Sequence, residues 1–325
     1  DPFSGRGTTV IEAGILGRKV ISNDINPLSK ILCHPRFNIP STKDLYDRLE
    51  SIEYKNNVIS DIDLSMFYHS KTLSEIISLK EYLERRNTMK LEDHLDEWIR
   101  MVATNRLTGH SAGFFSVYTL PPNQAVTSES QIKINIKRNQ NPEYRDTKKI
   151  IINKTQDLIK YITNEEINNL KKTESLFINM DARYTSIPDS VVQLSVTSPP
   201  FLDIVQYADD NWLRCWFNGI DIKEISKKMT VLKNLKQWCD VMGEVFKDLY
   251  RITKKKGWVC FEVGEVRNGK IKLDEYIVPL GIKAGFNCKC ILVNEQVFTK
   301  TSNIWGVENN NKGTNSNRIV IFYKE

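Results

Sequence analysis

The chain has 325 residues, of which 40% are hydrophobic and 26% charged, a composition typical of soluble globular proteins. No stretch approaches the roughly 18 uninterrupted apolar residues that a membrane-spanning helix needs, so we expect a cytoplasmic protein without a membrane partner. The formal net charge of +6 suits a polyanionic partner, although many soluble enzymes are equally basic.

Residues 1–9 form a glycine-containing loop, and the sequence predicts a helix over residues 8–16 that stops at Gly17. The apolar run 19–22 predicts a short strand that ends at Asn23-Asp24. The chain thus begins with a loop, a helix and a strand that ends in an acid.

Gly5 and Gly7 allow the backbone of this loop to approach a ligand closely. The amino terminus of the helix offers N–H groups and a positive dipole end to a carboxylate or phosphate. Asp24 is placed to accept hydrogen bonds from ribose hydroxyls, as strand-end acids do in dinucleotide sites. A Gly-x-Gly turn alone is equally compatible with an ordinary turn, and the interpretation depends on the downstream motifs.

A long middle block, residues 28–173, is predominantly helical, with helical periodicity at 70–86 and 91–106. Residues 109–124 are rich in Gly, Pro and aromatic side chains. Residues 131–160 carry eight Lys and Arg side chains against few acids, which indicates either contact with phosphates or a solvated helix face.

The last block alternates strands and helices again. We predict strands at 176–180, 191–196 and 257–263, a long helical region at 208–254 and a helix at 274–284. An antiparallel pair at 288–298 and 318–323 closes the chain. This pattern predicts an α/β fold with a doubly wound, mostly parallel sheet, a C-terminal antiparallel pair and a largely helical insert.

The strand at 191–196 leads into Thr197-Ser198-Pro199-Pro200-Phe201, at the kind of strand end where open α/β sheets bind ligands. Two prolines fix the backbone and remove two N–H donors, so carbonyl oxygens and the Ser198 hydroxyl converge as acceptors. Acceptors that hold both hydrogens of an aromatic amine favour a tetrahedral nitrogen whose lone pair can attack a methyl sulfonium. Phe201 offers a face for a base swung out of a duplex.

These two motifs resemble those of the S-adenosylmethionine-dependent amino-methyltransferases of the class I, Rossmann-like fold. Residues 1–9, Asp-Pro-Phe-Ser-Gly-Arg-Gly-Thr-Thr, are similar to motif I of the family. Residues 197–201 resemble motif IV in the form typical of N4-cytosine-specific DNA modification methylases. Motif I precedes motif IV here, whereas many N4-cytosine enzymes have the reverse order.

The resemblance implies the cofactor S-adenosylmethionine and a catalytic domain made of residues 1–28 and 174–325, with a first strand before residue 1. Residues 29–173 are then an insert for target recognition. The implied catalytic residues are Ser198, Pro199, Pro200 and Phe201. The implied cofactor-binding residues are Asp1, Phe3, Gly5, Gly7, Thr8, Thr9, Asp24 and Asp181, of which Asp181 follows the third family strand and faces the adenine amino group.

The implied partner is double-stranded DNA, with a cognate restriction endonuclease acting on the same site. Within the insert we expect DNA contacts from Phe114, Phe115, Asn123, Gln124, Lys133, Lys137 and Arg138. Buried aromatic rings, a turn and a solvated helix face are the corresponding structural alternatives.

Three rival functions share parts of this pattern: an N6-adenine DNA methyltransferase, an RNA guanine-N2 methyltransferase and a catalytically decayed DNA-binding subunit. A C5-cytosine enzyme is disfavoured because no Pro-Cys dipeptide occurs. No metal site is expected, and the cysteines are expected to be reduced thiols. They are Cys33, Cys215, Cys239, Cys260, Cys288 and Cys290.

Overall fold

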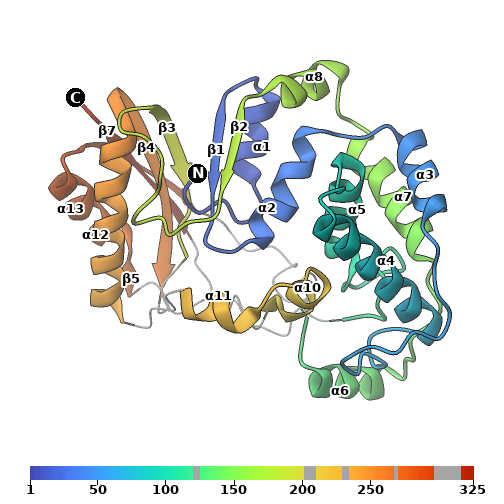
Figure 1. Cartoon of the computed structure of the whole chain (residues 1–325). Coiled ribbons are helices and arrows are strands. Elements are labelled where there is room, and N and C mark those ends of the chain that lie inside the picture. Colours follow the sequence, from blue (N-terminus) through green and yellow to red (C-terminus); the bar gives the residue numbers. More distant parts are fainter. Residues whose placement is uncertain (120–124, 201–209, 229–233, 267–269, 296–315) are drawn as a thin grey trace.

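Strand β1 (Val20–Asn23) pairs in parallel with β2 (Ser175–Ile178), although the whole helical insert separates them in the chain. The computed structural model, drawn in Figure 1, describes residues 1–119, 125–200, 210–228, 234–266, 270–295 and 316–325. Helix α1 (Thr8–Ile15) leads into β1 and packs beside α8 (Asn164–Lys172), which leads into β2.

The second group of strands has the order β3-β4-β7-β6. Strand β3 (Val192–Thr197) is parallel to β4 (Thr253–Val266), whereas β7 (Ser316–Tyr323) runs antiparallel to both β4 and β6 (Asn287–Glu295). The short β5 (Ile271–Lys272) pairs with the end of β4. The sheet is therefore parallel in its first part and closes with antiparallel strands, as predicted.

Alternating side chains show that helices cover both faces of the α/β part. Val20 and Phe177 pack with Leu170 of α8 in one cluster of apolar side chains. Ile21 and Ile178, one residue further along each strand, point to the opposite face and pack against a second apolar cluster. Helices α12 (Leu235–Ile252) and α13 (Asp274–Ala284) contribute to that second cluster. The doubly wound α/β arrangement predicted from the sequence is confirmed.

The insert is helical. It contains α2 (Leu28–Cys33), η1 (His34–Phe37), α3 (Thr42–Ser51), α4 (Ser70–Thr88), α5 (His94–Arg106), α6 (Ser128–Arg138) and α7 (Thr147–Ile159). A separate core of apolar side chains from α3, α4, α5 and α7 holds it together, with Trp98 and Phe67 almost fully buried. The indole N–H of Trp98 donates to Thr155 of α7 over 2.9 Å, which satisfies its one polar atom inside this core.

Two details differ from the sequence-based expectations. The helical region predicted over 208–254 is divided, in its described residues, into α10 (Trp212–Phe217), α11 (Ile222–Lys228) and α12, with Gly219 in the left-handed region at φ 64° after α10. Leu213 and Phe217 of α10 lie in the core of the insert. The two parts therefore share this helix, and the proposed domain boundaries remain a prediction.

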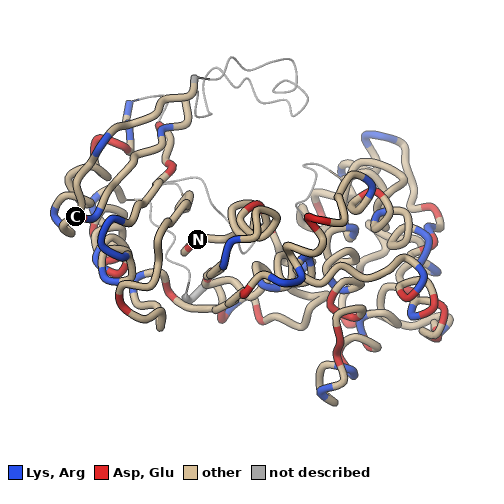
Figure 2. Tube along the Cα trace, turned by 90° about the horizontal axis from the view of Figure 1, so that it is seen from above, with Lys and Arg blue, Asp and Glu red and all other residues tan. Residues whose placement is uncertain are grey.

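The charged side chains are interspersed over both parts of the chain (Figure 2). None of the described helices is long and apolar enough to cross a membrane. No cluster of His, Cys, Asp and Glu side chains suited to a metal ion occurs among the described residues.

Candidate active site at the carboxyl ends of the strands

The loop that begins the chain lies along the end of β1. The backbone nitrogen of Asp1 donates to the Ile21 carbonyl and the Asp1 carbonyl accepts from the Asn23 N–H, both over 2.9 Å. The Ser4 N–H then donates to the Asn23 carbonyl, also over 2.9 Å. The pairing of the Asp1 backbone with β1 thus fixes the position of the loop that contains Gly5 and Gly7.

Gly5 and Gly7 both have positive φ, 51° and 84°, but their surroundings differ. A Cβ on Gly7 would lie 2.2 Å from the Cys33 Sγ, so Gly7 is needed for close packing against α2. A Cβ on Gly5 would have only the Phe3 carbonyl oxygen near it, at 4.0 Å. Gly5 therefore presents an open backbone surface, whereas Gly7 is a packing residue.

Asp24 organises the loop while keeping acceptor capacity. Its Oδ2 accepts from the Gly5 N–H over 2.8 Å, and its Oδ1 accepts from the Asn26 N–H over 2.9 Å. Burial raises the pKa of this carboxyl, and the two backbone hydrogen bonds oppose that rise. Because each carboxylate oxygen has two lone-pair directions, the partly exposed group can still accept hydrogen bonds from a ligand.

Asn23 is a structural residue of the site that the sequence analysis treated only as a strand end. It is fully buried, and its Nδ2 donates to the carbonyls of Pro2 and Met180 over 3.1 and 3.0 Å. Its Oδ1 accepts from the Met180 N–H over 3.0 Å. One amide thus joins the first loop to the loop after β2. The sequence signal for Asn23 is its place as a polar residue at the end of an apolar run.

Asp181 follows β2 closely and is engaged by a neighbour. The Arg183 guanidinium forms a bidentate pair with its carboxylate, with Nη2 at 2.6 Å from Oδ2 and Nε at 3.0 Å from Oδ1. Desolvation raises the pKa of Asp181, but the hydrogen bonds and charge of Arg183 outweigh it and lower the pKa. A ligand at Asp181 would share this carboxylate with Arg183.

The end of β3 meets the first loop directly. The buried Thr197 hydroxyl donates to the Asp1 Oδ1 over 2.6 Å, and the same oxygen accepts from the Phe3 N–H over 3.0 Å. Ser198 is exposed next to this contact, and Pro199 is buried. The Pro200 carbonyl accepts from the Trp238 indole N–H of α12 over 3.1 Å, which anchors the proline pair to the core.

The structure corrects part of the proposed DNA-contacting set. Phe115 is fully buried and Phe114 is 6% exposed, under the Arg106 guanidinium at 4.0 Å from the ring centre. Both rings are core residues and present no free face to a base. Asn123, Gln124 and Phe201 lie outside the described residues.

The remaining predicted site residues are placed as follows. Thr8 and Thr9 form the first turn of α1, with Thr8 exposed, and Phe3 packs against the sheet core. Lys133 and Lys137 are exposed on α6, and Arg138 stacks over the Tyr118 ring at 3.7 Å.

Cys33 is the cysteine that packs behind the loop, with its Sγ 3.9 Å from the Gly5 carbonyl oxygen. Its side chain is fully buried, and desolvation raises the pKa of its thiol to about 12. A thiol with that pKa is protonated at neutral pH, and thiolates rather than thiols are nucleophiles. This chemistry does not favour Cys33 as a nucleophile.

The fold and the site together define an α/β protein whose polar loops converge at the carboxyl ends of β1, β2 and β3. This is where open α/β sheets bind their ligands. The hydrogen bonds of Asn23, Asp24 and Thr197 hold the three ends together.

The chain matches no family model and no curated protein. Among solved structures it resembles TTHA0409 of Thermus thermophilus, a candidate DNA modification methylase, with 20% identity and a TM-score of 0.27 over 44% of this chain. The same protein complexed with S-adenosyl-L-methionine gives 18% identity over 44% of this chain and a TM-score of 0.28. The match spans 50% and 53% of the Thermus chain in these two structures, about half its length.

An S-adenosylmethionine-dependent methyltransferase from Methanosarcina mazei gives 13% identity and a TM-score of 0.27, covering 50% of this chain and 79% of that one.

Proposed function

We propose that the chain is the methyl-transferring part of an S-adenosylmethionine-dependent DNA methyltransferase. Its product would be N4-methylcytosine in duplex DNA, within a restriction-modification system. The observation that carries this proposal is the hydrogen bond between Thr197 and Asp1, because it joins the glycine loop to the Ser-Pro-Pro strand end. A methyl donor bound at the glycine loop and an amine bound at the Ser-Pro-Pro strand end would then be neighbours.

The residues around the loop fit the proposed cofactor. The open surface at Gly5 accommodates close approach, and the first turn of α1 offers backbone N–H groups to a carboxylate. The Asp24 carboxylate would accept from ribose hydroxyls, and Asp181 would accept from an adenine amino group. When bound, S-adenosylmethionine supplies a methyl group on a positively charged sulfonium sulfur.

The Ser-Pro-Pro end suits an exocyclic amine. The exposed Ser198 hydroxyl and the Pro199 carbonyl would accept the two amino hydrogens, which favours a tetrahedral nitrogen with a free lone pair. Trp238 holds the Pro200 carbonyl, so we assign Pro200 a positioning role. Fixing the amine in line with the methyl group then supplies much of the rate enhancement.

The test is methyl transfer by the intact protein. Unmodified duplex DNA is incubated with the protein and S-adenosylmethionine that carries a labelled methyl group, and the nucleosides are analysed by mass spectrometry after digestion. We expect N4-methylcytosine, and we expect Ser198→Ala to lower kcat more than it raises the Kd of the cofactor. Ser65→Ala, an exposed serine of the insert, is the matched control and should leave both unchanged.

The products separate the alternatives. N6-methyladenine would keep the site and change the target base, whereas 5-methylcytosine would overturn the direct-transfer mechanism. Label in RNA guanine would favour the RNA methyltransferase. Absence of label, with DNA binding retained, would favour a decayed subunit.

A further inference from the structure

Helix α6 is fixed to the protein through one polar face. Gln131 is fully buried, and its Nε2 donates to the Tyr118 carbonyl over 3.0 Å and to the Asn135 Oδ1 over 2.7 Å. Gln140 donates to the same two acceptors, and the Asn135 Nδ2 donates to the Met66 carbonyl over 2.8 Å. These amides hold the helix in place, which leaves the opposite face unused by the fold.

That opposite face combines three kinds of side chain. Ile136 is 76% exposed and Ile132 is 44% exposed, although branched apolar side chains usually avoid water. Lys133 and Lys137 are exposed one residue further along the helix. Isolated exposed isoleucines need no explanation, but here they form a stripe with two cations beside it.

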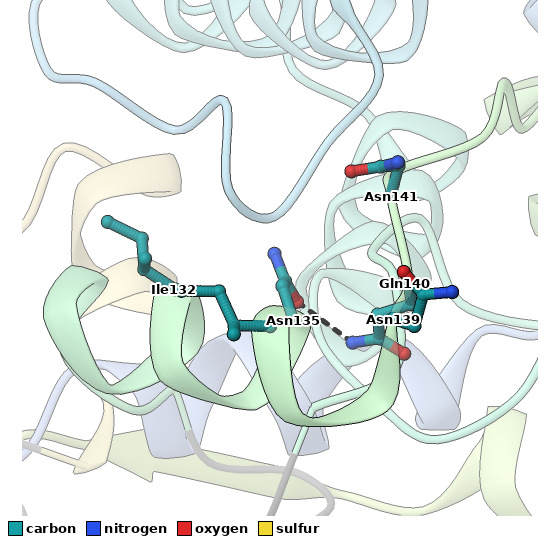
Figure 3. A pocket seen from close by; sticks show the side chains of 6 residues that line it. Ile132, Asn135, Asn139, Gln140 and Asn141 are labelled. Atoms are coloured by element: carbon teal, nitrogen blue, oxygen red, sulfur yellow. Dashed lines mark hydrogen bonds between the residues drawn. The ribbon is translucent and has the colours of Figure 1, made fainter.

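Two asparagines complete this surface at the end of the helix. Asn139 terminates α6 in the left-handed conformation at φ 47°, and both Asn139 and Asn141 are exposed. Within the described part of the chain, neither side-chain amide makes a hydrogen bond. With Ile132 and Ile136 they line an open groove of about 340 Å³, and Figure 3 shows the Asn135–Gln140 hydrogen bond among its lining side chains.

The segment that leads into α6 is held by hydrogen bonds to residues 210–212. Just before the helix, the Ala125 N–H donates to the Asp210 carbonyl over 3.2 Å. The Trp212 indole N–H of α10 donates to the Ala125 and Val126 carbonyls over 3.1 and 3.3 Å. The chain entering α6 is thus bonded to Asp210 and to the start of α10.

We infer that α6 enters the major groove of the DNA substrate, an inference that rests on the proposed function. An α-helix fits this groove, and the 11 residues of α6 span about 16 Å. The amides of Asn139 and Asn141 pair with adenine edges, Ile132 and Ile136 contact thymine methyl groups, and Lys133 and Lys137 contact phosphates. The surface therefore selects A·T pairs within the sequence that the protein recognises.

The experiment measures sequence preference and salt dependence separately. The intact protein is equilibrated with a duplex library that has a randomised segment, at two salt concentrations, and the bound DNA is sequenced. The double variant Asn139→Gly plus Asn141→Ala keeps the left-handed turn and removes both amides. We expect it to lose preference at one or two A·T positions by roughly 5- to 150-fold each.

The lysines should behave differently. Lys133→Gln plus Lys137→Gln should weaken binding to all sequences and lower the salt slope by about two. Matched controls are Asn57→Gly, an exposed left-handed asparagine at φ 55°, and Lys171→Gln plus Lys172→Gln on α8. These controls should change neither the preferred sequence nor the slope.

Two results would overturn the inference. One is an unchanged preferred sequence in the asparagine double variant. The other concerns the variant Ile136→Ser. If it kept the sequence preference and the salt slope but lost self-association of the protein, the isoleucine stripe would be a protein interface. Methyl transfer measured on the same DNA separates this inference from the proposed function. If the wild type is active but the α6 variants keep its sequence preference, only the role of α6 is refuted. An α6-dependent preference without methyl transfer refutes only the chemistry.

Discussion

The Thr197 hydroxyl and the Asp1 carboxylate, 196 residues apart in the chain, share a 2.6 Å hydrogen bond in the candidate active site. Asp1 also pairs with β1 through its backbone, so the ends of β1 and β3 are connected through this one residue. Because Ser198 follows Thr197 directly, the bond sets where the proposed catalytic hydroxyl lies relative to the glycine loop.

Replacing Thr197 with Val keeps the volume and removes the hydroxyl. A hydrogen bond to a charged group contributes about 1.5–3 kcal/mol, so we expect a stability loss in that range and a fall in kcat for methyl transfer. Urea unfolding and steady-state kinetics measure the two effects. Thr253→Val removes another buried hydroxyl, which donates to the Leu249 carbonyl, and should cost stability without lowering kcat. Equal kcat values in the two variants would contradict the proposed role.

The two loop glycines should respond differently to alanine. Both positions are left-handed, which costs an L-residue about 1–2 kcal/mol. Gly7→Ala adds a clash with the Cys33 Sγ, so its stability loss should reach about 2–5 kcal/mol. Gly5→Ala has no such clash, so its stability loss should be limited to the roughly 1–2 kcal/mol of the left-handed conformation, and it should also lower the affinity for S-adenosylmethionine.

Calorimetry with the cofactor and thermal unfolding distinguish these outcomes. Cys33→Ala in the Gly7→Ala background should recover part of the stability, because it removes the Sγ but leaves the Cβ at 2.9 Å. If both alanine variants lost the same stability, the packing role of Gly7 would be wrong.

The two strand-end acids should affect stability with opposite pH dependence. The pKa of Asp24 is raised by burial above 3.8, so its stabilising contribution is present at low pH and is lost as pH rises through the raised pKa. The pKa of Asp181 is lowered below 3.8 because Arg183 outweighs desolvation, so its contribution is present above 3.8 and is lost as pH falls.

The difference in unfolding free energy between the wild type and Asp24→Ala should therefore grow in favour of the wild type as pH falls from about 7 to 4. The corresponding difference for Asp181→Ala should shrink as pH falls below about 4. Denaturant titrations across this range measure both slopes. Arg183→Gln should abolish the slope attributed to Asp181. Parallel slopes for the two acids would contradict the assignment.

Glu75 should be a stability residue of the insert. Its Oε2 accepts from both the N–H and the hydroxyl of the fully buried Thr147 over 3.0 Å, and its Oε1 accepts from the Tyr144 hydroxyl over 2.9 Å. Glu75→Ala leaves the buried Thr147 N–H without its partner, at about 1–3 kcal/mol. Glu84→Ala, whose carboxylate is exposed beside Lys80, should cost less than about 1 kcal/mol. Urea midpoints compare the two variants, and equal midpoints would contradict the prediction.

Much of the fold followed from periodicity and strand-end chemistry. The helices predicted over 8–16 and 274–284 correspond to α1 and α13, and the predicted strands correspond to β1, β2, β3, β4, β6 and β7 in their described residues. Period-2 and period-3.6 apolar patterns are local properties, so the sequence displays them directly. The division of the helical region at 208–254 was not predicted, because a single glycine such as Gly219 does not interrupt a helical apolar pattern. The burial of α10 against the insert depends on residues that are distant in the chain.

For the candidate site, the sequence by itself indicated Gly5, Asp24, Asp181 and Ser198, because their types and positions at strand ends define a chemistry. Only the tertiary structure decided which residues hold these strand ends together: Thr197 with Asp1, Asn23 with Met180, and Trp238 with Pro200. It also decided that Phe114 and Phe115 are buried, while Asn139 and Asn141 are free at the surface. These partners lie 38 to 196 residues apart in the chain, and no local pattern encodes contacts at such separations.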